Sequence, residues 1–298
     1  MNPDSAFKET AWNHIRFKTP GDWEPCVIDQ HHLMLEKNGG PVMEIRWGAV
    51  KKNFSPEYSL REMTKRHGKN LKESITKTRV PGIWKNVLYE KTTEITAFSW
   101  YGENQKAAGL ILYNKASLNS VFIQFFVQNP AKPDGVTASV LKSLGYTADE
   151  KNVLWAMFDI RAILPTGFSM SRHSFAPGKY ELVFSAKNHK IILHRWGPAS
   201  VLLKNGNLVR FAEQQFQPAV IEHEKKFMDR YESAKWEIHK FESGKKFFFL
   251  KKLFSPAVHQ GRIWHVEEKN RILGIISIEK KPPPDHLVRN ICKNFKCT

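Results

Sequence analysis

Cysteine is scarce in this chain, and apolar runs long enough to cross a membrane are missing. Three cysteines occur among 298 residues: Cys26, Cys292 and Cys297. They are too few and too scattered for a disulfide framework, and such usage is typical of a reducing compartment. The nearest candidate for a span, Ser120 to Ala131, is shorter than the roughly 18 residues required. Asp4, Lys8 and Glu9 interrupt any signal sequence. We therefore expect a cytoplasmic protein with no membrane span.

The motifs that commonly carry catalysis or cofactors are also missing. The sequence contains neither a glycine-rich phosphate-binding loop nor a Gly-x-Ser-x-Gly nucleophile motif. His31 and His32 are adjacent, so in a strand they point to opposite faces and cannot easily share an ion. Cys292 and Cys297 lack the two further ligands of a zinc site. We therefore expect no catalytic residues, no metal and no cofactor.

What the chain does contain is a repeated segment. Met43 to Gly48 closes on Arg-Trp-Gly, and Ile192 to Gly197 repeats the pattern 149 residues later. Such an apolar run predicts a buried strand that ends at a turn. Because 298 residues exceed the usual size of one core, we predict two domains, 1–149 and 150–298, as copies of one module. The signature of the repeat is Arg46, Trp47, Gly48, Arg195, Trp196 and Gly197.

Other segments match between the two halves. Pro20-Gly21-Asp22-Trp23 and Pro165-Thr166-Gly167-Phe168 each follow a short strand pattern, and a hairpin comes next in both halves. Ser55-Pro56-Glu57 predicts the start of a helix, as do Pro133-Asp134 and Pro284-Asp285. The predicted module is β-β-β-α-β-β-β-α, an α+β unit whose antiparallel sheet is covered by helices.

This order of elements resembles the PsbP-like fold. The resemblance depends on the opening strand, the turn Pro20-Gly21-Asp22-Trp23, the hairpin and the helix after it. Domains with this fold are mostly non-enzymatic binding modules, so the resemblance implies a binding role and nothing finer about function. A duplicated ferredoxin-like unit is the structural alternative, although six strands per unit fit it less well.

Basic residues outnumber acidic ones, 46 Lys and Arg against 29 Asp and Glu, for a net charge of +17. Such an excess favours an anionic partner, although lysines also simply keep an aromatic-rich protein soluble. On a helix from Pro56 onward, the basic residues fall on the face opposite the apolar stripe. The candidate partner-binding residues are Lys51, Lys52, Arg61, Lys65, Arg66, Lys69, Lys72, Lys225, Lys226, Arg230, Lys245, Lys246, Lys251 and Lys252.

Arg46 and Arg195 each precede a tryptophan at the end of a predicted strand. Alternation along the strand predicts that each tryptophan packs inward and each arginine points out. We favour an ion pair at the sheet edge, with an acid such as Glu44 or one in the second half, over binding of an anionic ligand.

Three hypotheses for function follow. The favoured one is a non-catalytic binding or assembly module whose basic surface takes an anionic macromolecule, either nucleic acid or an acidic protein. A second is a subunit or adaptor that docks a protein partner within a larger complex. The third is an enzyme with a site at the domain junction.

Overall fold

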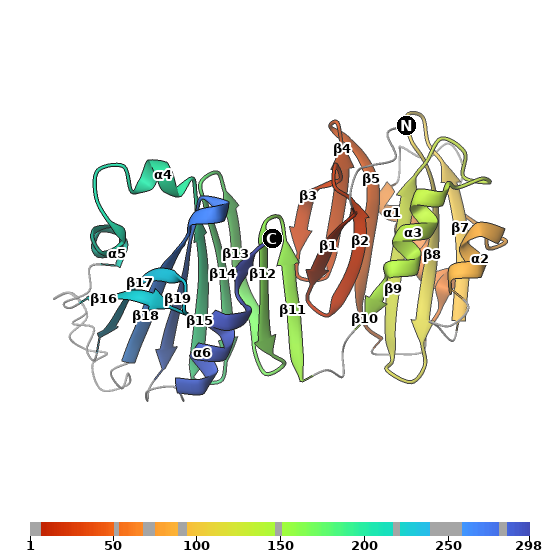
Figure 1. Cartoon of the computed structure of the whole chain (residues 1–298). Coiled ribbons are helices and arrows are strands. Elements are labelled where there is room, and N and C mark those ends of the chain that lie inside the picture. The colour runs from red at the N-terminus through yellow and green to blue at the C-terminus, as the bar shows by residue number, and fades with distance from the viewer. Residues whose placement is uncertain are drawn as a thin grey trace. The chain divides into compact units, whose positions relative to one another are not determined.

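The computed structural model describes residues 7–50, 54–67, 75–88, 94–146, 151–216, 221–238, 258–279 and 285–298. The chain divides into two compact units, Met1–Asp149 (unit 1) and Glu150–Thr298 (unit 2) (Figure 1). Both contain antiparallel sheets together with helices, so the α+β class predicted from the sequence is confirmed. Among the described residues, no helix is long and apolar enough to cross a membrane.

Unit 1 is built around a seven-stranded sheet with the order β3-β4-β5-β9-β8-β7-β6, while β1 and β10 flank β2. Its strands are β1 (Phe7–Trp12), β2 (Ile15–Pro20), β3 (Glu24–Asp29), β4 (His32–Lys37), β5 (Gly40–Ala49), β6 (Thr76–Thr78), β7 (Glu94–Tyr101), β8 (Lys106–Asn114), β9 (Asn119–Phe126) and β10 (Gly145–Tyr146). Its helices are α1 (Pro56–His67), α2 (Gly82–Leu88) and α3 (Gly135–Ser143).

Unit 2 has a seven-stranded sheet with the order β13-β14-β15-β19-β18-β17-β16, while β11 and β20 flank β12. Its strands are β11 (Asn152–Met157), β12 (Ile160–Pro165), β13 (Ser169–Ala176), β14 (Lys179–Ala186), β15 (His189–Trp196), β16 (Glu222–Phe227), β17 (Tyr231–Ile238), β18 (Val258–Val266), β19 (Arg271–Glu279) and β20 (Lys296–Cys297). Its helices are α4 (Ala199–Leu202), α5 (Leu208–Phe216), the 3₁₀ turn η3 (Glu267–Lys269) and α6 (Asp285–Asn294).

The predicted module of six strands and two helices is too short. Five strands, not three, precede the first helix of each unit. Phe7–Trp12 shows no clear periodicity in the sequence, yet it pairs with β2 along its whole length as β1. The prediction also omits α2, because seven residues are too few to reveal a helical period.

The predicted helix starts at Ser55 and Asp134 are confirmed. The hydroxyl of Ser55 accepts a hydrogen bond from the Tyr58 amide at 3.1 Å, and the carboxylate of Asp134 accepts one from the Thr137 amide at 3.0 Å. Each bond satisfies an amide that has no partner within the helix. The third predicted start is confirmed as well, because α6 begins at Asp285.

Both faces of each seven-stranded sheet are covered. In unit 1, α1 packs Leu60 and Met63 against Phe98 and Trp100 of β7. In unit 2, α5 packs Phe211 into a cluster with residues of β15, β17, β18 and β19. Central strands are therefore buried on both sides; β8 is buried from Ala107 to Tyr113. A strand of this kind is a continuous apolar run rather than an alternating one.

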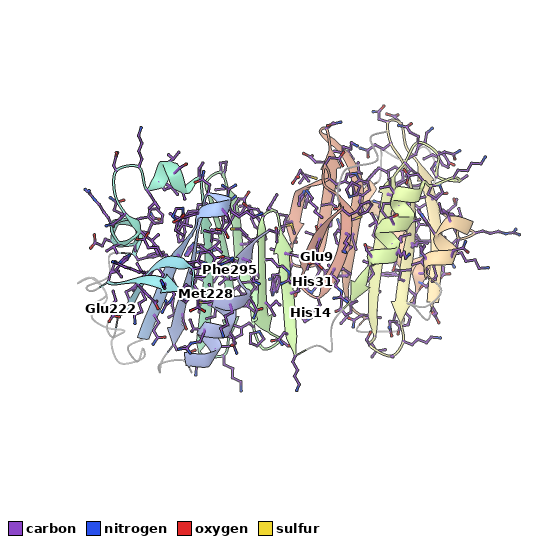
Figure 2. The ribbon with its side chains drawn as sticks, in the orientation of Figure 1. Glu9, His14, His31, Glu222, Met228 and Phe295 are labelled. Atoms are coloured by element: carbon purple, nitrogen blue, oxygen red, sulfur yellow. The ribbon has the colours of Figure 1, made fainter. Side chains whose placement is uncertain are left out.

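The two units differ in what lies beside the helix that precedes the last strand, which is α3 in unit 1 and α6 in unit 2. In unit 1, α2 packs on α3 (Figure 1), and Trp84 of α2 is fully buried against Phe125 with ring centroids 5.6 Å apart. In unit 2, β16 and β17 are joined directly by a tight turn that contains Met228 (Figure 2), and Met228 and Asp229 both have positive φ angles. No helix lies between these two strands of unit 2.

Candidate functional site

Few of the predicted partner-binding residues can be placed. Arg61 and Lys65 are exposed on α1, and Lys65 Nζ lies 2.8 Å from Glu62 Oε1. Arg66 lies in α1, where only its backbone is described. The remaining predicted residues of unit 1 and those beyond Arg230 fall outside the described residues: Lys51, Lys52, Lys69, Lys72, Lys245, Lys246, Lys251 and Lys252.

Lys225 and Lys226 have a structural role that the sequence did not suggest for them. They are exposed on β16, an edge strand, where the register shifts between Glu224 and Phe227. A bulge and lysines on an edge strand both hinder pairing with another chain. Arg230 stacks on the Tyr231 ring, with 4.3 Å from its guanidinium carbon to the ring centroid. The structure therefore gives these three residues local explanations besides partner binding.

Both tryptophans of the Arg-Trp-Gly repeat are buried near the end of a strand, as predicted, but their surroundings differ. Trp47 Nε1 donates a hydrogen bond to the Asn13 carbonyl in the β1–β2 turn at 2.9 Å. Trp196 instead packs against Phe211 and Phe216 of α5, with ring centroids 5.5 and 5.8 Å away. In unit 2 it is Arg195 that contacts the equivalent turn, through Asp159.

A single extra residue explains the difference. The pairing of β4 with β5 has an irregularity between Leu35 and Glu36, where two steps along β5 match one along β4. The pairing of β14 with β15 is regular throughout. A shift of one residue sends every later side chain to the other face of the sheet. The two tryptophans therefore share a sequence pattern and not an environment.

The arginines of the repeat are ion-paired, as the favoured interpretation predicted. Arg46 Nε lies 2.8 Å from Glu44 Oε1, and Arg195 Nε lies 3.0 Å from Asp159 Oδ2. Arg46 points out with 41% of its side chain exposed, but Arg195 is buried at 7%. The expectation that both arginines point outward is therefore wrong for Arg195, because the one-residue shift puts it at the position that the buried Trp47 occupies in unit 1.

Glu44 is the centre of a buried polar network in unit 1 that sequence analysis missed. His32 Nε2 lies 2.9 Å from its carboxylate, and Gln124 Nε2 donates to it at 2.6 Å. Trp100 Nε1 donates in turn to Gln124 at 2.8 Å. Burial alone would raise the pKa of Glu44, but contacts with His32, Arg46 and Gln124 outweigh it and lower the pKa to about 2. A charge so well satisfied is a structural anchor.

His189, Ser277 and Glu279 form a second arrangement that resembles catalytic geometry. Ser277 Oγ lies 2.9 Å from His189 Nε2, and Glu279 contacts His189 Nδ1. A serine nucleophile needs access to a carbonyl carbon. Ser277 has no exposed surface, and desolvation lowers the pKa of His189 to about 4. The triad therefore satisfies buried polar groups between β15 and β19 and does not present a nucleophile to a substrate.

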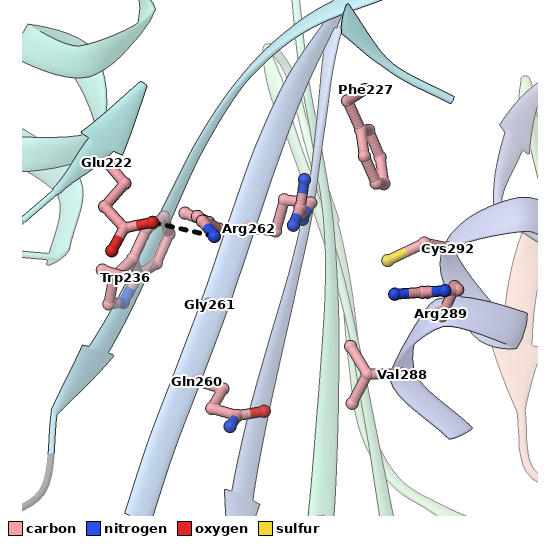
Figure 3. Close-up of a pocket in the computed structure, with 10 residues that line it drawn as sticks. Glu222, Phe227, Trp236, Gln260, Gly261, Arg262, Val288, Arg289 and Cys292 are labelled. Carbon is pink, nitrogen blue, oxygen red and sulfur yellow. Dashed lines mark ion pairs between the residues drawn. The ribbon is translucent and has the colours of Figure 1, made fainter. Parts of the chain in front are cut away.

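Unit 2 contains a cavity of about 470 Å³ between the β16–β18 side of its sheet and α6 (Figure 3). Among the described residues, three cations line it, together with aromatic, amide and aliphatic side chains. The described lining residues are Glu222, Phe227, Lys235, Trp236, Gln260, Gly261, Arg262, Val288, Arg289 and Cys292. Burial raises the pKa of the Cys292 thiol to about 12, so this cysteine is neutral and unreactive at pH 7.

Two of the three cations in the cavity are neutralised locally. Lys235 Nζ lies 2.8 Å from Glu222 Oε2, and Arg262 contacts Glu224. Arg262 also stacks on the Phe227 ring at 4.1 Å. Arg289 is exposed on α6, and among the described residues no acid pairs with it. Arg289 is therefore the cation of this cavity that is available to a ligand.

Strand register shows which residues of unit 1 occupy the equivalent positions. Gly109 lies opposite Phe98 and Gln124, as Gly261 lies opposite Trp236 and Ile276. In both units the aromatic ring covers the glycine, since an added Cβ would come within 2.3 Å of Phe98 and 2.1 Å of Trp236. Pairs at matching positions are Ala97 and Lys235, Ala108 and Gln260, and Leu110 and Arg262.

The residues of α3 and α6 can be matched through the strands that follow them, β10 and β20. Gly145 of β10 pairs with Arg16, and Lys296 of β20 pairs with Arg161. Counting back along each chain places Ala138 of α3 at the position of Arg289, and Thr137 at that of Val288. The unit 1 residues that match Lys235, Gln260, Arg262 and Arg289 are all buried: Ala97, Ala108, Leu110 and Ala138.

Sequence analysis could not find this cavity, since its residues come from three strands and a helix and share no motif. Among the described residues, no group of three or more His, Cys, Asp or Glu side chains is placed to hold a metal ion.

Comparisons with known proteins add little. No family model matches the chain, and no curated protein matches it. Among solved structures, the chain is similar to the T6SS immunity protein TplEi from Pseudomonas aeruginosa, complexed with "L" peptide, at 9% identity and a TM-score of 0.36 over 99% of each chain. A likeness of that size carries no argument about fold or function.

Proposed function

We propose that this protein is a non-catalytic binding module, made of two tandem copies of one α+β unit, that binds an acidic protein segment. The cavity of unit 2, with Arg289 at its wall, is the observation that carries the proposal. A carboxylate can form two parallel, charge-assisted hydrogen bonds with an arginine, and such bonds are stronger than those between neutral groups.

The tandem duplication is supported by shared construction and no longer by the Arg-Trp-Gly repeat. Both seven-stranded sheets have the same strand order. The third strand of each unit also has a register irregularity. In unit 1 it lies at Cys26, where β3 pairs with β4, and in unit 2 at Ser171, where β13 pairs with β14. The glycine covered by an aromatic ring recurs at Gly109 and Gly261. Local irregularities such as β-bulges tend to be conserved among related proteins.

The charges around the cavity favour an acidic protein over nucleic acid. Nucleic acid presents a continuous row of phosphates, whereas the pairing of Lys235 with Glu222 and of Arg262 with Glu224 leaves a single cation among the described lining residues, Arg289, to meet an anion at this cavity. Successive side chains of a protein segment point in different directions, so one carboxylate can reach Arg289 while its neighbours point into solvent. Protein is therefore the partner class that we propose for this surface.

The test compares two anionic probes by fluorescence anisotropy: a labelled 20-residue polyglutamate and a labelled 20-nucleotide single-stranded DNA. We expect polyglutamate to bind, and Arg289→Glu to weaken it about tenfold or more, because a hydrogen bond to a charged group contributes about 1.5–3 kcal/mol. Lys204→Glu, an exposed change of equal charge on unit 2, is the control and should leave binding within about twofold. Tighter binding of DNA at both 50 and 200 mM salt, or equal effects of the two variants, would refute the proposal.

A further inference from the structure

The cavity of unit 2 lies where unit 1 holds helix α2. Trp84 of α2 contacts Phe125 and donates a hydrogen bond to Thr137, and Phe125 pairs with Ala108 across the strands. In unit 2 the matching positions of Thr137 and Ala108 are Val288 and Gln260, which both line the cavity. The place that a helix takes in unit 1 therefore corresponds to a cavity between the described strands and α6 of unit 2.

The open space is more polar than its filled counterpart. Where unit 1 buries Ala97, Leu110 and Ala138, unit 2 has Lys235, Arg262 and Arg289. Lys235 and Arg262 are paired with Glu222 and Glu224, and Arg289 is exposed to water, so an anionic group that enters the cavity can pair with Arg289. Phe227 supplies aromatic surface beside Arg262, with 4.1 Å from the guanidinium carbon to the ring centroid.

We infer that the cavity binds a short acidic helix of a partner protein in the manner in which unit 1 holds its own α2. The inference rests on the proposed function and adds the shape and the anchor of the partner segment. An aromatic side chain and an aliphatic one four residues later, as Trp84 and Leu88 are in α2, would enter the cavity. Carboxylates on the flank of that helix would face Arg289. This is recognition of an amphipathic helix in a groove by anchors on one face.

The test uses a synthetic peptide of residues 79–93 of this chain that carries Lys85→Glu and Asn86→Glu, two positions that are exposed in α2. Isothermal titration against the full chain should show binding, and circular dichroism of the mixture should show gained helix. Trp84→Ala in the peptide should weaken binding at least about 30-fold, as expected of an aromatic anchor. Arg289→Glu in the protein should weaken it about tenfold or more, and Lys204→Glu should not.

Two peptide ligands separate this inference from the proposed function. Val288→Trp places a bulky ring at the cavity wall and should weaken binding of the helical peptide, whose aromatic anchor must enter the cavity, much more than binding of polyglutamate, and equal weakening of the two would contradict the helix site. If a scrambled peptide of the same composition binds as tightly as the helical one, the helix site is wrong while the acidic-partner proposal stands. If wild-type protein binds polyglutamate and not the helical peptide, the inference fails in the same way. If the wild-type protein binds neither polyglutamate nor the helical peptide, the proposed function and this inference are both wrong.

Discussion

The indole Nε1 of Trp84 donates a hydrogen bond to Oγ1 of Thr137 at 3.0 Å, and both side chains are buried. This bond and the ring behind it hold α2 on α3. Because α2 has only seven residues, its own hydrogen bonds cannot keep it helical in water. The stability of this part of unit 1 therefore depends on the side chains that α2 buries, Trp84 and Leu88, of which Trp84 is the larger.

The first prediction concerns that side chain. Trp84→Ala should lower the free energy of unfolding by about 3–5 kcal/mol, the usual cost of deleting a buried aromatic ring. Urea titration followed by circular dichroism would measure it. Ile83→Ala, one residue away and exposed, should cost less than about 0.5 kcal/mol. Equal losses in the two variants would show that Trp84 does not anchor α2.

The second prediction concerns the glycines beneath aromatic rings. Gly261→Ala would bring a Cβ within 2.1 Å of the Trp236 ring, and Gly109→Ala within 2.6 Å of the Ile123 carbonyl oxygen. Overpacking of this kind should destabilise each variant by about 1–3 kcal/mol. Gly135→Ala is the matched control, because an added Cβ there meets nothing within 4 Å. Thermal unfolding should leave the control unchanged or slightly more stable, and a loss in the control as large as in the others would contradict the packing argument.

The third prediction is acid sensitivity from Glu44. Its pKa is about 2 in the folded chain and 4.5 when unperturbed. A lowered carboxyl pKa stabilises the fold above the unfolded value, so this contribution is complete above about pH 4.5 and is lost as pH falls towards 2. Its size is on the order of 3 kcal/mol. Glu44→Gln should lower stability at pH 7 and flatten the dependence between pH 4.5 and 2 in urea titrations. Glu213→Gln, at an exposed site on α5, should keep the wild-type slope.

The fourth prediction is a loss of stability caused by His194, which begins at a higher pH than the loss caused by Glu44. Desolvation, aided by the positive charges of Lys179 and Arg172, lowers the pKa of His194 to about 3, although Glu181 lies 3.6 Å away. Because the folded chain keeps this histidine neutral, stability should fall as pH drops below about 6.5 and continue to fall towards 3.

His194→Phe would remove the titrating group and keep an aromatic ring stacked on Trp196. Its stability should therefore change less than that of wild type between pH 6.5 and 4.5, a range in which Glu44 stays ionised. His223→Gln, an exposed site, is the control. Parallel curves for His194→Phe and wild type would show that His194 does not account for the acid sensitivity in that range.

Local rules were sufficient to predict some features of the chain. Ser55 and Asp134 were identified as helix starts because capping depends on the few residues next to the cap. The α+β class followed from strand and helix patterns that are each only a few residues long. The ion pair of Arg46 with Glu44 was predicted because the two residues lie two apart on one strand and so share a face.

Register and long-range proximity were decided only by the tertiary structure. The sequence by itself determined that Arg-Trp-Gly occurs twice, but one extra residue in β5 places Trp47 and Trp196 on opposite faces, and no local pattern reveals such a bulge. The cavity beside α6 exists because Glu222, Arg262 and Arg289 come together from distant segments and because unit 2 has no helix between β16 and β17. A site made by packing of this kind has no signature along the chain, since its residues become neighbours only when the sheet and the helix meet.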